Sequence, residues 1–129
     1  MIENLCKIAI EQLEFSYSPY SKCKVGAALL AKSGKIYTGC NIENASFGAT
    51  NCAERTAFFK AISEGEKDFN AIAIAAQKDG NPVEFLPCGI CRQVMAEFCD
   101  GDFKIFTVKG ENQFSEYTLS RLLPNLFSL

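Results

Sequence analysis

The feature that most constrains this chain is a set of three cysteines divided between two short motifs. Residues 51–55 read Asn-Cys-Ala-Glu-Arg, and residues 87–91, 36 positions further on, read Pro-Cys-Gly-Ile-Cys. Thiolates are preferred ligands of zinc, and clustered cysteines in a chain of this kind favour a metal site. If Cys52, Cys88 and Cys91 bind one ion, the fold must bring these two distant segments together.

Three thiol ligands would leave one position of a tetrahedral zinc ion open. Four protein ligands are typical of structural zinc, whereas three leave room for a water that the metal makes acidic. Glu54 lies two residues after Cys52, and side chains at that spacing on a regular helix diverge by about 200°. We therefore expect Glu54 to move protons beside the metal and not to bind it.

Two other interpretations of the cysteines stay open from their spacing. The pair Cys88 and Cys91 at a helix start is also typical of a redox dithiol, although dithiol exchange requires neither a third thiol nor a glutamate. A structural zinc site is the second alternative, because any remaining cysteine would serve as a fourth ligand: Cys6, Cys23, Cys40 or Cys99. The ordinary role of these four is that of a small buried apolar side chain.

Arg55 follows Cys52 by three residues and is a candidate for balancing the charge of the site. Three thiolates around a dication carry one excess negative charge, which weakens the acidification of a bound water. We expect Arg55 to donate to ligand sulfurs and to offset that charge. The alternative is an arginine that pairs with a surface carboxylate.

Composition limits the classes of protein to which the chain belongs. With 129 residues, 48% of them hydrophobic, we expect a single domain over residues 1–129. The net charge of −2 without a basic stripe argues against nucleic acid, and no apolar run is long enough for a membrane span. Seven cysteines without a signal-like start indicate a reducing, cytoplasmic setting. Histidine is absent, so any metal chemistry must use sulfur and carboxylate.

Apolar periodicity and turn residues predict strands that alternate with helices. Two strands around a glycine-containing turn form a hairpin, Pro87 precedes a helix, and Asn51 is a plausible N-cap. The expected elements are helix 2 to about 14, loop 16–21, strands 25–30 and 36–38, loop 41–51, a helix ending at Gly65, strand 71–76, helix 88 to about 99, strand 103–108 and helix 118–123. The fold class is α/β, with a mixed sheet between helical layers.

Beyond these inferences, the chain resembles the small cytidine deaminases of pyrimidine salvage. The C-x-E and P-C-x-x-C motifs form the three-cysteine variant of the zinc deaminase signature. The resemblance covers nearly the whole chain, in residues 18–22, 25–29, 38–46, 52–55, 87–93 and 122–124 together with Phe127. It implies a three-layer α/β/α fold with a mixed five-stranded sheet. It also implies one zinc ion per chain, bound by Cys52, Cys88 and Cys91.

The activity implied by the resemblance is hydrolytic deamination of cytidine and 2′-deoxycytidine, in which a zinc-activated water attacks C4 and Glu54 shuttles protons. Asn41 and Glu43 correspond to the residues that bind the sugar hydroxyls. Their spacing in an extended segment directs both side chains to one side, where they offer donors and acceptors. Further substrate-binding positions implied are Ala53, Cys23, Val25, Ala45, Phe47 and Phe127.

Members of this size are homotetramers whose active sites are completed by neighbouring subunits. Ala45, Phe47 and Phe127 match positions that reach across such interfaces. The partners implied are therefore a nucleoside substrate and further copies of the chain, with no nucleic acid and no membrane.

Two residues depart from the family's pattern. The family usually has Phe, packed against the pyrimidine, where this chain has Cys23, and the missing ring is worth roughly 0.5 to 1.5 kcal/mol. Phe47 stands where Tyr is frequent. The alternatives are a deaminase of another small aminated heterocycle, such as a nucleoside antibiotic, and a structural zinc module or catalytically silent binding protein. The intact Glu54 argues against a silent protein.

Overall fold

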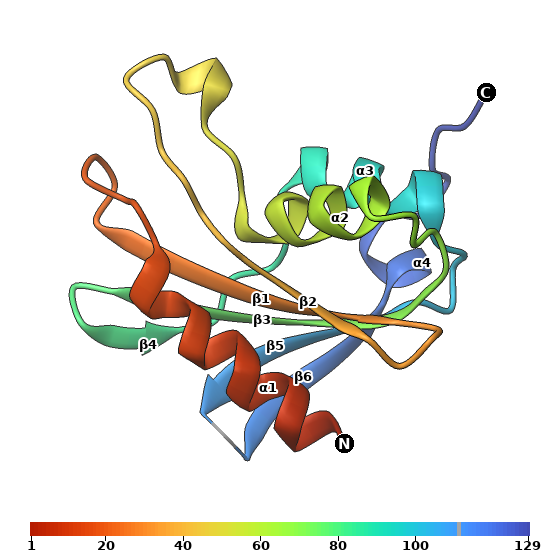
Figure 1. The fold of residues 1–129 in the computed structure, drawn as a ribbon, viewed down its shortest axis with the longest axis horizontal. Coiled ribbons are helices and arrows are strands. Elements are labelled where there is room, and N and C mark those ends of the chain that lie inside the picture. Colours follow the sequence, from red (N-terminus) through yellow and green to blue (C-terminus); the bar gives the residue numbers. More distant parts are fainter. Residues whose placement is uncertain (111) are drawn as a thin grey trace.

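One β-sheet lies between two layers of helices, as Figure 1 shows for the computed structural model, which describes residues 1–110 and 112–129. Helix α1 (Ile2–Glu11) covers one face of the sheet. Helices α2 (Ala53–Ser63), α3 (Gly89–Phe98) and α4 (Leu119–Leu122) lie on the other face. The predicted three-layer α/β/α fold is confirmed.

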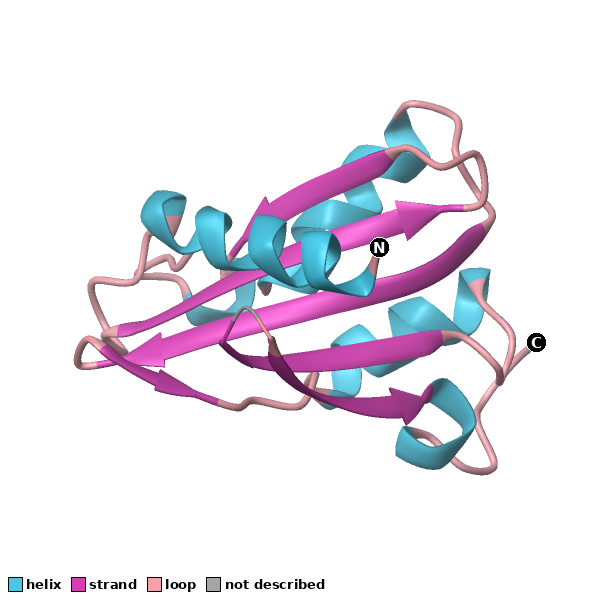
Figure 2. Ribbon diagram, turned by 90° about the horizontal axis from the view of Figure 1, so that it is seen from below, coloured by secondary structure: helices cyan, strands magenta, loops and turns pink. Residues whose placement is uncertain are grey.

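The sheet is mixed, as predicted, and follows the order β2-β1-β3-β5-β6 (Figure 2). The strands are β1 (Cys23–Ala31), β2 (Ile36–Cys40), β3 (Phe69–Lys78), β4 (Asn81–Val83), β5 (Lys104–Gly110) and β6 (Gln113–Thr118). Strands β3 and β5 run parallel, and the other pairs are antiparallel. The short β4 pairs with the end of β3, beyond the segment of β3 that β5 contacts, and so adds a sixth strand to the five expected.

The two faces of the sheet carry different side chains, because successive residues of a strand point to opposite sides. On the face of α2 and α3, Leu29, Ile72 and Ile74 pack with Phe58 of α2 and Met95 of α3. On the face of α1, the sheet presents mainly alanines, against Leu5, Cys6 and Ala9 of the helix. Small side chains on this side let α1 lie close to the sheet.

Two glycines permit helices to touch the sheet backbone. A Cβ atom on Gly26 would lie 2.3 Å from the carbonyl oxygen of Ala9 in α1. A Cβ atom on Gly39 of β2 would lie 2.4 Å from the oxygen of Ala53 and 2.6 Å from the nitrogen of Ala57. Real side chains do not tolerate such distances, so Gly39 fixes how closely the first turn of α2 approaches the sheet.

Several element boundaries differ from the prediction. Helix α1 ends at Glu11 and continues as a 3₁₀ helix, η1 (Gln12–Phe15), and a second 3₁₀ helix, η2 (Phe47–Ala49), interrupts the loop 41–51. The N-cap of α2 is Cys52 and not Asn51, whose side chain bonds to Thr56 instead. Strands β4 and β6 were not predicted, because β4 has three residues and β6 is a largely polar edge strand.

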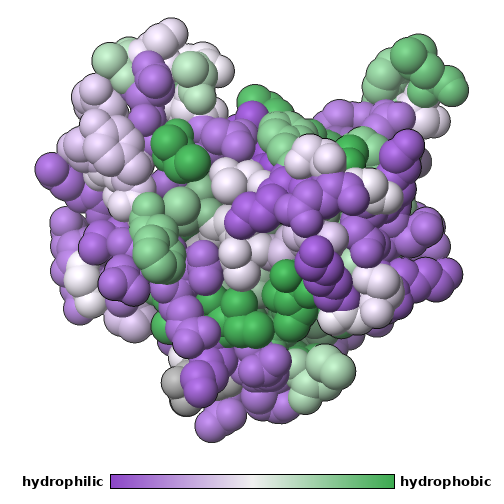
Figure 3. Space-filling view, viewed as in Figure 1, coloured by the Kyte–Doolittle hydropathy of each residue, from purple (hydrophilic) through white to green (hydrophobic). Residues whose placement is uncertain are grey.

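The loop around η2 and the C-terminal residues project from the body on the side of α2 and α3 (Figures 1 and 3). Phe47 and Phe127 lie in these two segments and are 76% and 65% exposed. Within the described residues, no helix has the length and apolar character needed to cross a membrane.

Candidate active site

Cys52, Cys88 and Cys91 meet where two helices begin. Cys52 is the N-cap residue of α2 and Cys88 that of α3, both with extended backbone. Their Sγ atoms lie 3.7 Å apart, and Sγ of Cys91 lies 3.5 Å from that of Cys88. The three sulfurs all lie within 4.8 Å of one another. The two motifs therefore converge, as the metal-site prediction requires.

Each N-cap thiol contacts the side chain of the third residue of its own helix, and neither thiol makes a capping hydrogen bond to the helix backbone. In α3 that residue is Cys91, which becomes the third sulfur of the cluster. In α2 it is Arg55, whose Nη2 lies 3.4 Å from Sγ of Cys52. The same local geometry thus yields two different partners for the two N-cap thiols.

The helix starts favour thiolates at the cluster. Unpaired N–H groups and the positive end of the helix dipole stabilise negative charge there. A hydrogen bond from Cys91, opposed by burial and assisted by Arg55, lowers the pKa of Cys52 to about 5. The hydrogen bond with Cys52, together with burial, raises the pKa of Cys91 in turn. Of these two thiols, Cys52 therefore loses its proton more readily.

Arg55 is oriented by the sulfurs. Burial alone would lower the pKa of its guanidinium, but Cys52 and Cys91 raise it above the usual value. Its Nε atom is buried and makes no hydrogen bond within the described residues. The contact expected of Arg55 is present, and its effect on the charge of a bound metal stays a prediction.

Glu54 is buried beside the thiols, with 4% of its surface exposed. Burial raises its pKa to about 7, although its own backbone N–H and Arg55 act in the opposite direction. The divergence of about 200° expected between Cys52 and Glu54 applies to two residues inside one helix. That argument fails here, because Cys52 is extended and lies before the helix, so both residues line one cavity.

Hydrogen bonds hold both helix starts in place. The hydroxyl of Thr56 lies 3.0 Å from the carbonyl oxygen of Cys40, which joins α2 to β2 beside Gly39. Arg92 donates from Nε to the oxygen of Pro87 and from Nη1 to that of Leu122, each at 2.7 Å. The residue just before Cys88 is therefore tied to the end of α4.

A cavity of about 260 Å³ opens beside the cluster. Its lining includes seven residues singled out from the sequence: Val25, Asn41, Glu43, Cys52, Ala53, Glu54 and Cys88. Five further lining residues were not assigned to the site: Thr50, Asn51, Ile74, Phe85 and Leu86. Phe85 and Leu86 are an apolar pair directly before the second motif. This pair is the sequence signal that would have indicated an apolar part of the cavity lining.

Asn41 and Glu43 both line this cavity, and their side chains are fixed by the segment 16–25. Oδ1 of Asn41 accepts from the backbone N–H of Val25 at 2.9 Å and from the hydroxyl of Ser16. Nδ2 of Asn41 donates to the oxygen of Cys23 at 2.8 Å. One N–H of the amide stays available for a ligand.

Glu43 is held by the loop before β1. Its Oε1 accepts from the backbone N–H groups of Tyr20 and Ser21 at 2.9 and 3.2 Å, and Oε2 accepts from the Ser21 hydroxyl. Burial acts to raise the pKa of this carboxyl, but these hydrogen bonds lower it below its usual value. Glu43 is therefore an oriented carboxylate with acceptor capacity left on Oε2.

Four residues predicted for substrate binding lie outside the lining of the cavity. Cys23 stands on the same strand as Val25 but at its start, and its Sγ lies 3.7 Å from the oxygen of Ser21. Phe47 borders a neighbouring hollow of about 180 Å³ that also reaches Glu43. Ala45 and Phe127 are exposed, and Gln93 of α3 donates to the backbone oxygen of Phe127 at 3.0 Å. The roles of these residues stay predictions.

A fourth cysteine ligand does not appear among the described residues. The metal-ligand group in that part of the chain consists of Cys52, Cys88 and Cys91. Cys6, a residue of α1, packs against the opposite face of the sheet, and burial raises its pKa to about 11. Cys40 lies beside the oxygen of Phe15. This arrangement disfavours the four-cysteine structural site.

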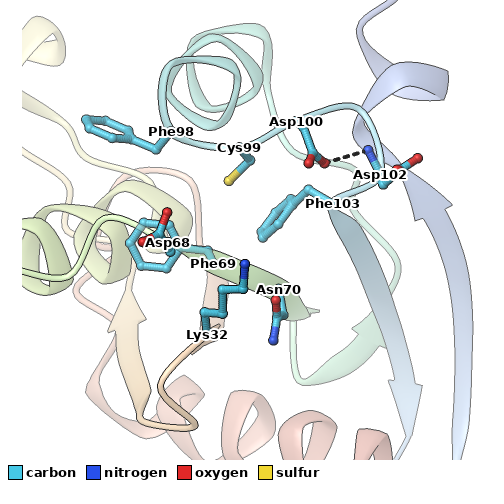
Figure 4. A pocket seen from close by; sticks show the side chains of 9 residues that line it. All are labelled: Lys32, Asp68, Phe69, Asn70, Phe98, Cys99, Asp100, Asp102 and Phe103. Atoms are coloured by element: carbon cyan, nitrogen blue, oxygen red, sulfur yellow. Dashed lines mark hydrogen bonds between the residues drawn. The ribbon is translucent and has the colours of Figure 1, made fainter.

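Cys99 borders a different hollow, shown in Figure 4, where α3 ends and β3 and β5 begin. Burial raises the pKa of its thiol to about 12. The side chains of Lys32, Asp68 and Asp100 surround this hollow, and Asp100 accepts from the backbone N–H of Asp102 at 2.9 Å. The hollow contains none of the residues of the thiol cluster.

Known proteins resemble this chain along most or all of its length. The model of the family described as "Cytidine and deoxycytidylate deaminase zinc-binding region" matches residues 1–107. A cytidine deaminase of Sporosarcina psychrophila is 50% identical over 127 residues, which are 98% of this chain and 91% of that protein. A cytidine deaminase of Halalkalibacterium halodurans is 53% identical over 124 residues, 96% and 92% of the two chains. The crystal structure of cytidine deaminase from Burkholderia pseudomallei superposes with a TM-score of 0.89 at 39% identity, covering 98% and 99% of the chains.

Proposed function

Because the chain belongs to the cytidine and deoxycytidylate deaminase family, a family of zinc-binding hydrolytic deaminases, we propose that it converts cytidine and 2′-deoxycytidine to uridine and 2′-deoxyuridine with release of ammonia. The observation that carries this proposal is the gathering of three thiols and the buried carboxyl of Glu54 at one cavity. We assign this reaction to pyrimidine salvage, since the substrates are free nucleosides.

Cys52, Cys88 and Cys91 would hold one zinc ion per chain. With Zn–S bonds of about 2.3 Å, the sulfurs of a tetrahedral site lie about 3.8 Å apart. The separations of 3.7 and 3.5 Å fit that requirement, and soft thiolate donors suit zinc. A bound zinc ion supplies the Lewis acidity that makes water a nucleophile near neutral pH.

Glu54 would carry the protons of the reaction. It takes a proton from the attacking water as the new bond forms at C4, and gives it to ring nitrogen N3. It then takes the proton of the new C4 hydroxyl and gives it to the exocyclic nitrogen, so the C4–N bond breaks, ammonia leaves and a carbonyl remains at C4. Burial supports this role, because a carboxyl with a pKa raised to about 7 both accepts and donates protons near neutral pH.

Asn41 and Glu43 would bind the sugar. The available N–H of Asn41 suits a hydroxyl oxygen, and the carboxylate of Glu43 accepts from a hydroxyl. Their existing hydrogen bonds hold both groups in place before the ligand arrives, which lowers the cost of ordering them. Ala53 and Val25 line the same cavity and would contact the substrate there.

The assembly would be a homotetramer with shared active sites, formed by a single domain over residues 1–129 in the cytoplasm. Exposed Phe47 and Phe127 support the interfaces, because large apolar side chains at such exposure are typical of interaction surfaces. Seven free thiols fit a reducing compartment. Light scattering on the purified protein gives the number of subunits, and a monomer at working concentration would contradict shared sites.

The deaminase reaction is tested by following the loss of cytidine absorbance with purified, zinc-loaded protein. Deoxycytidine, cytosine, cytidine monophosphate and aminated nucleoside antibiotics are assayed in parallel. We expect turnover of the two nucleosides above all others. If the protein deaminates an antibiotic but not cytidine, the proposed substrate is wrong and the proposed reaction class still holds.

A further inference from the structure

Phe85 and Leu86 form an apolar wall on the cavity that also holds Glu54 and Cys88. They are 38% and 45% exposed, although apolar side chains of this size are usually better covered. Among the described residues that line the cavity, Phe85 is the one aromatic side chain. An exposed aromatic ring beside a buried acid is a surface on which a flat ligand would lie.

The path of the backbone brings this wall to the site. Val83, at the end of β4, pairs with Ala76 of β3, which pairs on its other side with Val25 of β1. From Val83 the chain passes through residues 84–87 to Cys88, the N-cap of α3. Phe85 and Leu86 therefore connect the sheet under the cavity with the thiol cluster.

Glu84 anchors the start of this segment to the sheet. The hydroxyl of Thr107, a fully buried residue of β5, donates to Oε1 of Glu84, and Nζ of Lys109 lies 3.4 Å from Oε2. The hydrogen bond from Thr107 lowers the pKa of Glu84. Glu84 is thus tied to β5 and Cys88 begins α3, so the backbone is held on both sides of Phe85.

The lining of the cavity offers two kinds of chemistry. Asn41 and Glu43 provide donors and acceptors, whereas Phe85, Leu86 and Ile74 provide apolar contact. A nucleoside is divided in the same way, into a polyhydroxyl sugar and a flat base. An aromatic ring stacks on such a base more favourably than an aliphatic side chain of equal area.

We propose that Phe85, backed by Leu86, is the surface on which the base of the substrate stacks, and that it determines which aminated heterocycles are accepted. This proposal rests on the proposed function, because it assigns the base end of the same cavity. It also places the aromatic surface on a different segment from Cys23, whose side chain does not line the cavity.

The first test compares Phe85→Leu with Phe85→Tyr, using uridine as the binding probe and cytidine as the substrate. We expect Phe85→Leu to raise the Kd of uridine and the KM of cytidine roughly 2- to 12-fold, the effect of losing one aromatic pair. Phe85→Tyr keeps the ring and should keep both values. Zinc content and kcat should change little, because Phe85 is neither a thiol of the cluster nor the proposed proton carrier. Equal uridine affinity in wild type and Phe85→Leu would overturn the proposal.

Phe59→Leu is the matched control. Phe59 is 48% exposed on α2 and does not line the cavity. The same substitution at similar exposure should leave uridine affinity unchanged. If Phe59→Leu weakens uridine binding as much as Phe85→Leu does, the effect is general and the proposed role of Phe85 is wrong.

A second experiment distinguishes an error in the proposed role of Phe85 from an error in the proposed function. The chain contains no tryptophan, so Phe85→Trp introduces a single fluorophore into the cavity and Phe59→Trp places one outside it. Both are titrated with uridine, adenosine, free cytosine and ribose. If any heterocycle quenches the fluorescence of Phe85→Trp and ribose does not, the result supports base stacking at position 85 even if cytidine is not the substrate. No response to any heterocycle, or an equal response at position 59, overturns it.

Discussion

Cys52 and Cys88 occupy the same place in two different helices: each is an N-cap residue, and their Sγ atoms lie 3.7 Å apart. Each thiol faces the third residue of its helix, Arg55 in one case and Cys91 in the other. Two helix starts thus supply three sulfurs, one guanidinium and free backbone N–H groups around a single point. Proteins bind anions and thiolate-bound metals at helix N-termini for this electrostatic reason.

Removing any sulfur of the cluster should release the metal. We expect Cys52→Ala, Cys88→Ala and Cys91→Ala each to bind far less than one zinc ion per chain, because two thiols do not complete the three-ligand set. Metal analysis of the purified variants measures this. Cys99→Ala, which alters a half-buried thiol away from the cluster, is the control and should retain zinc. Loss of zinc in Cys99→Ala would point to a fourth ligand.

Arg55→Gln should weaken the site without removing a ligand. The substitution deletes the charge beside Cys52, so the excess negative charge of the three thiolates is no longer offset. We expect a loss of about 10- to 100-fold in zinc affinity or kcat, as for other residues that contact metal ligands. Competition with a chelator measures the affinity. Arg121→Gln, on the surface over the ring of Tyr117, should behave as wild type.

Gly39→Ala should destabilise the protein and disturb the site together. The new Cβ would lie 2.4 Å from the oxygen of Ala53, so the first turn of α2 must move away from β2. We expect a cost of roughly 1 to 3 kcal/mol in unfolding free energy, typical of overpacking, together with weaker zinc binding. Gly48→Ala is the matched control, because a Cβ there meets nothing within 4 Å. Equal denaturation midpoints for the two variants would contradict this account of Gly39.

The carboxylate of Glu43 should stabilise the fold in a pH-dependent way. Its pKa in the folded protein is lowered, so its contribution is present above the unfolded value of about 4.3 and is lost as the pH falls through the folded value. Glu43→Gln should therefore lose less stability than wild type between pH 7 and about pH 3. Thermal melts of both proteins measure the difference. Ser21→Ala removes one donor to Glu43, so its loss of stability on acidification should lie between those of wild type and Glu43→Gln. An equal fall in melting temperature with pH for wild type and Glu43→Gln would refute the effect.

Much of the site could be predicted because its functional residues lie in short motifs. The thiols of residues 52, 88 and 91 and the nearby carboxyl of Glu54 follow from residue type and spacing, and Pro87 marks the start of a helix. The exact N-cap was wrong, since Asn51 is the better capping residue by propensity. Cys52 takes that position because the amide of Asn51 bonds to Thr56 and its backbone pairs with Ile42.

Other parts of the molecule depend on contacts that no local pattern encodes. Strand β6 has a mixed polar sequence, and its place is set by pairing with β5 and by Phe114 packing on Phe106 at 5.5 Å between ring centroids. In sequence, Phe85 is marked only as one of an apolar pair directly before the second motif, and that pair does not reveal what it contacts. Its position on the cavity results from the pairing of β4 and from the anchoring of Glu84 by Thr107, a contact across 23 residues.

Glu54→Gln tests the central claim most directly. The amide keeps the size of the side chain but neither accepts nor releases a proton at neutral pH, so zinc should stay near one ion per chain while kcat for cytidine falls more than roughly 100-fold. Glu64→Gln, which breaks an exposed ion pair with Lys35, is the control and should retain full activity. The decisive measurement is kcat for cytidine in zinc-loaded Glu54→Gln: a loss of this size supports Glu54 as the proton carrier, and a value near wild type would contradict it.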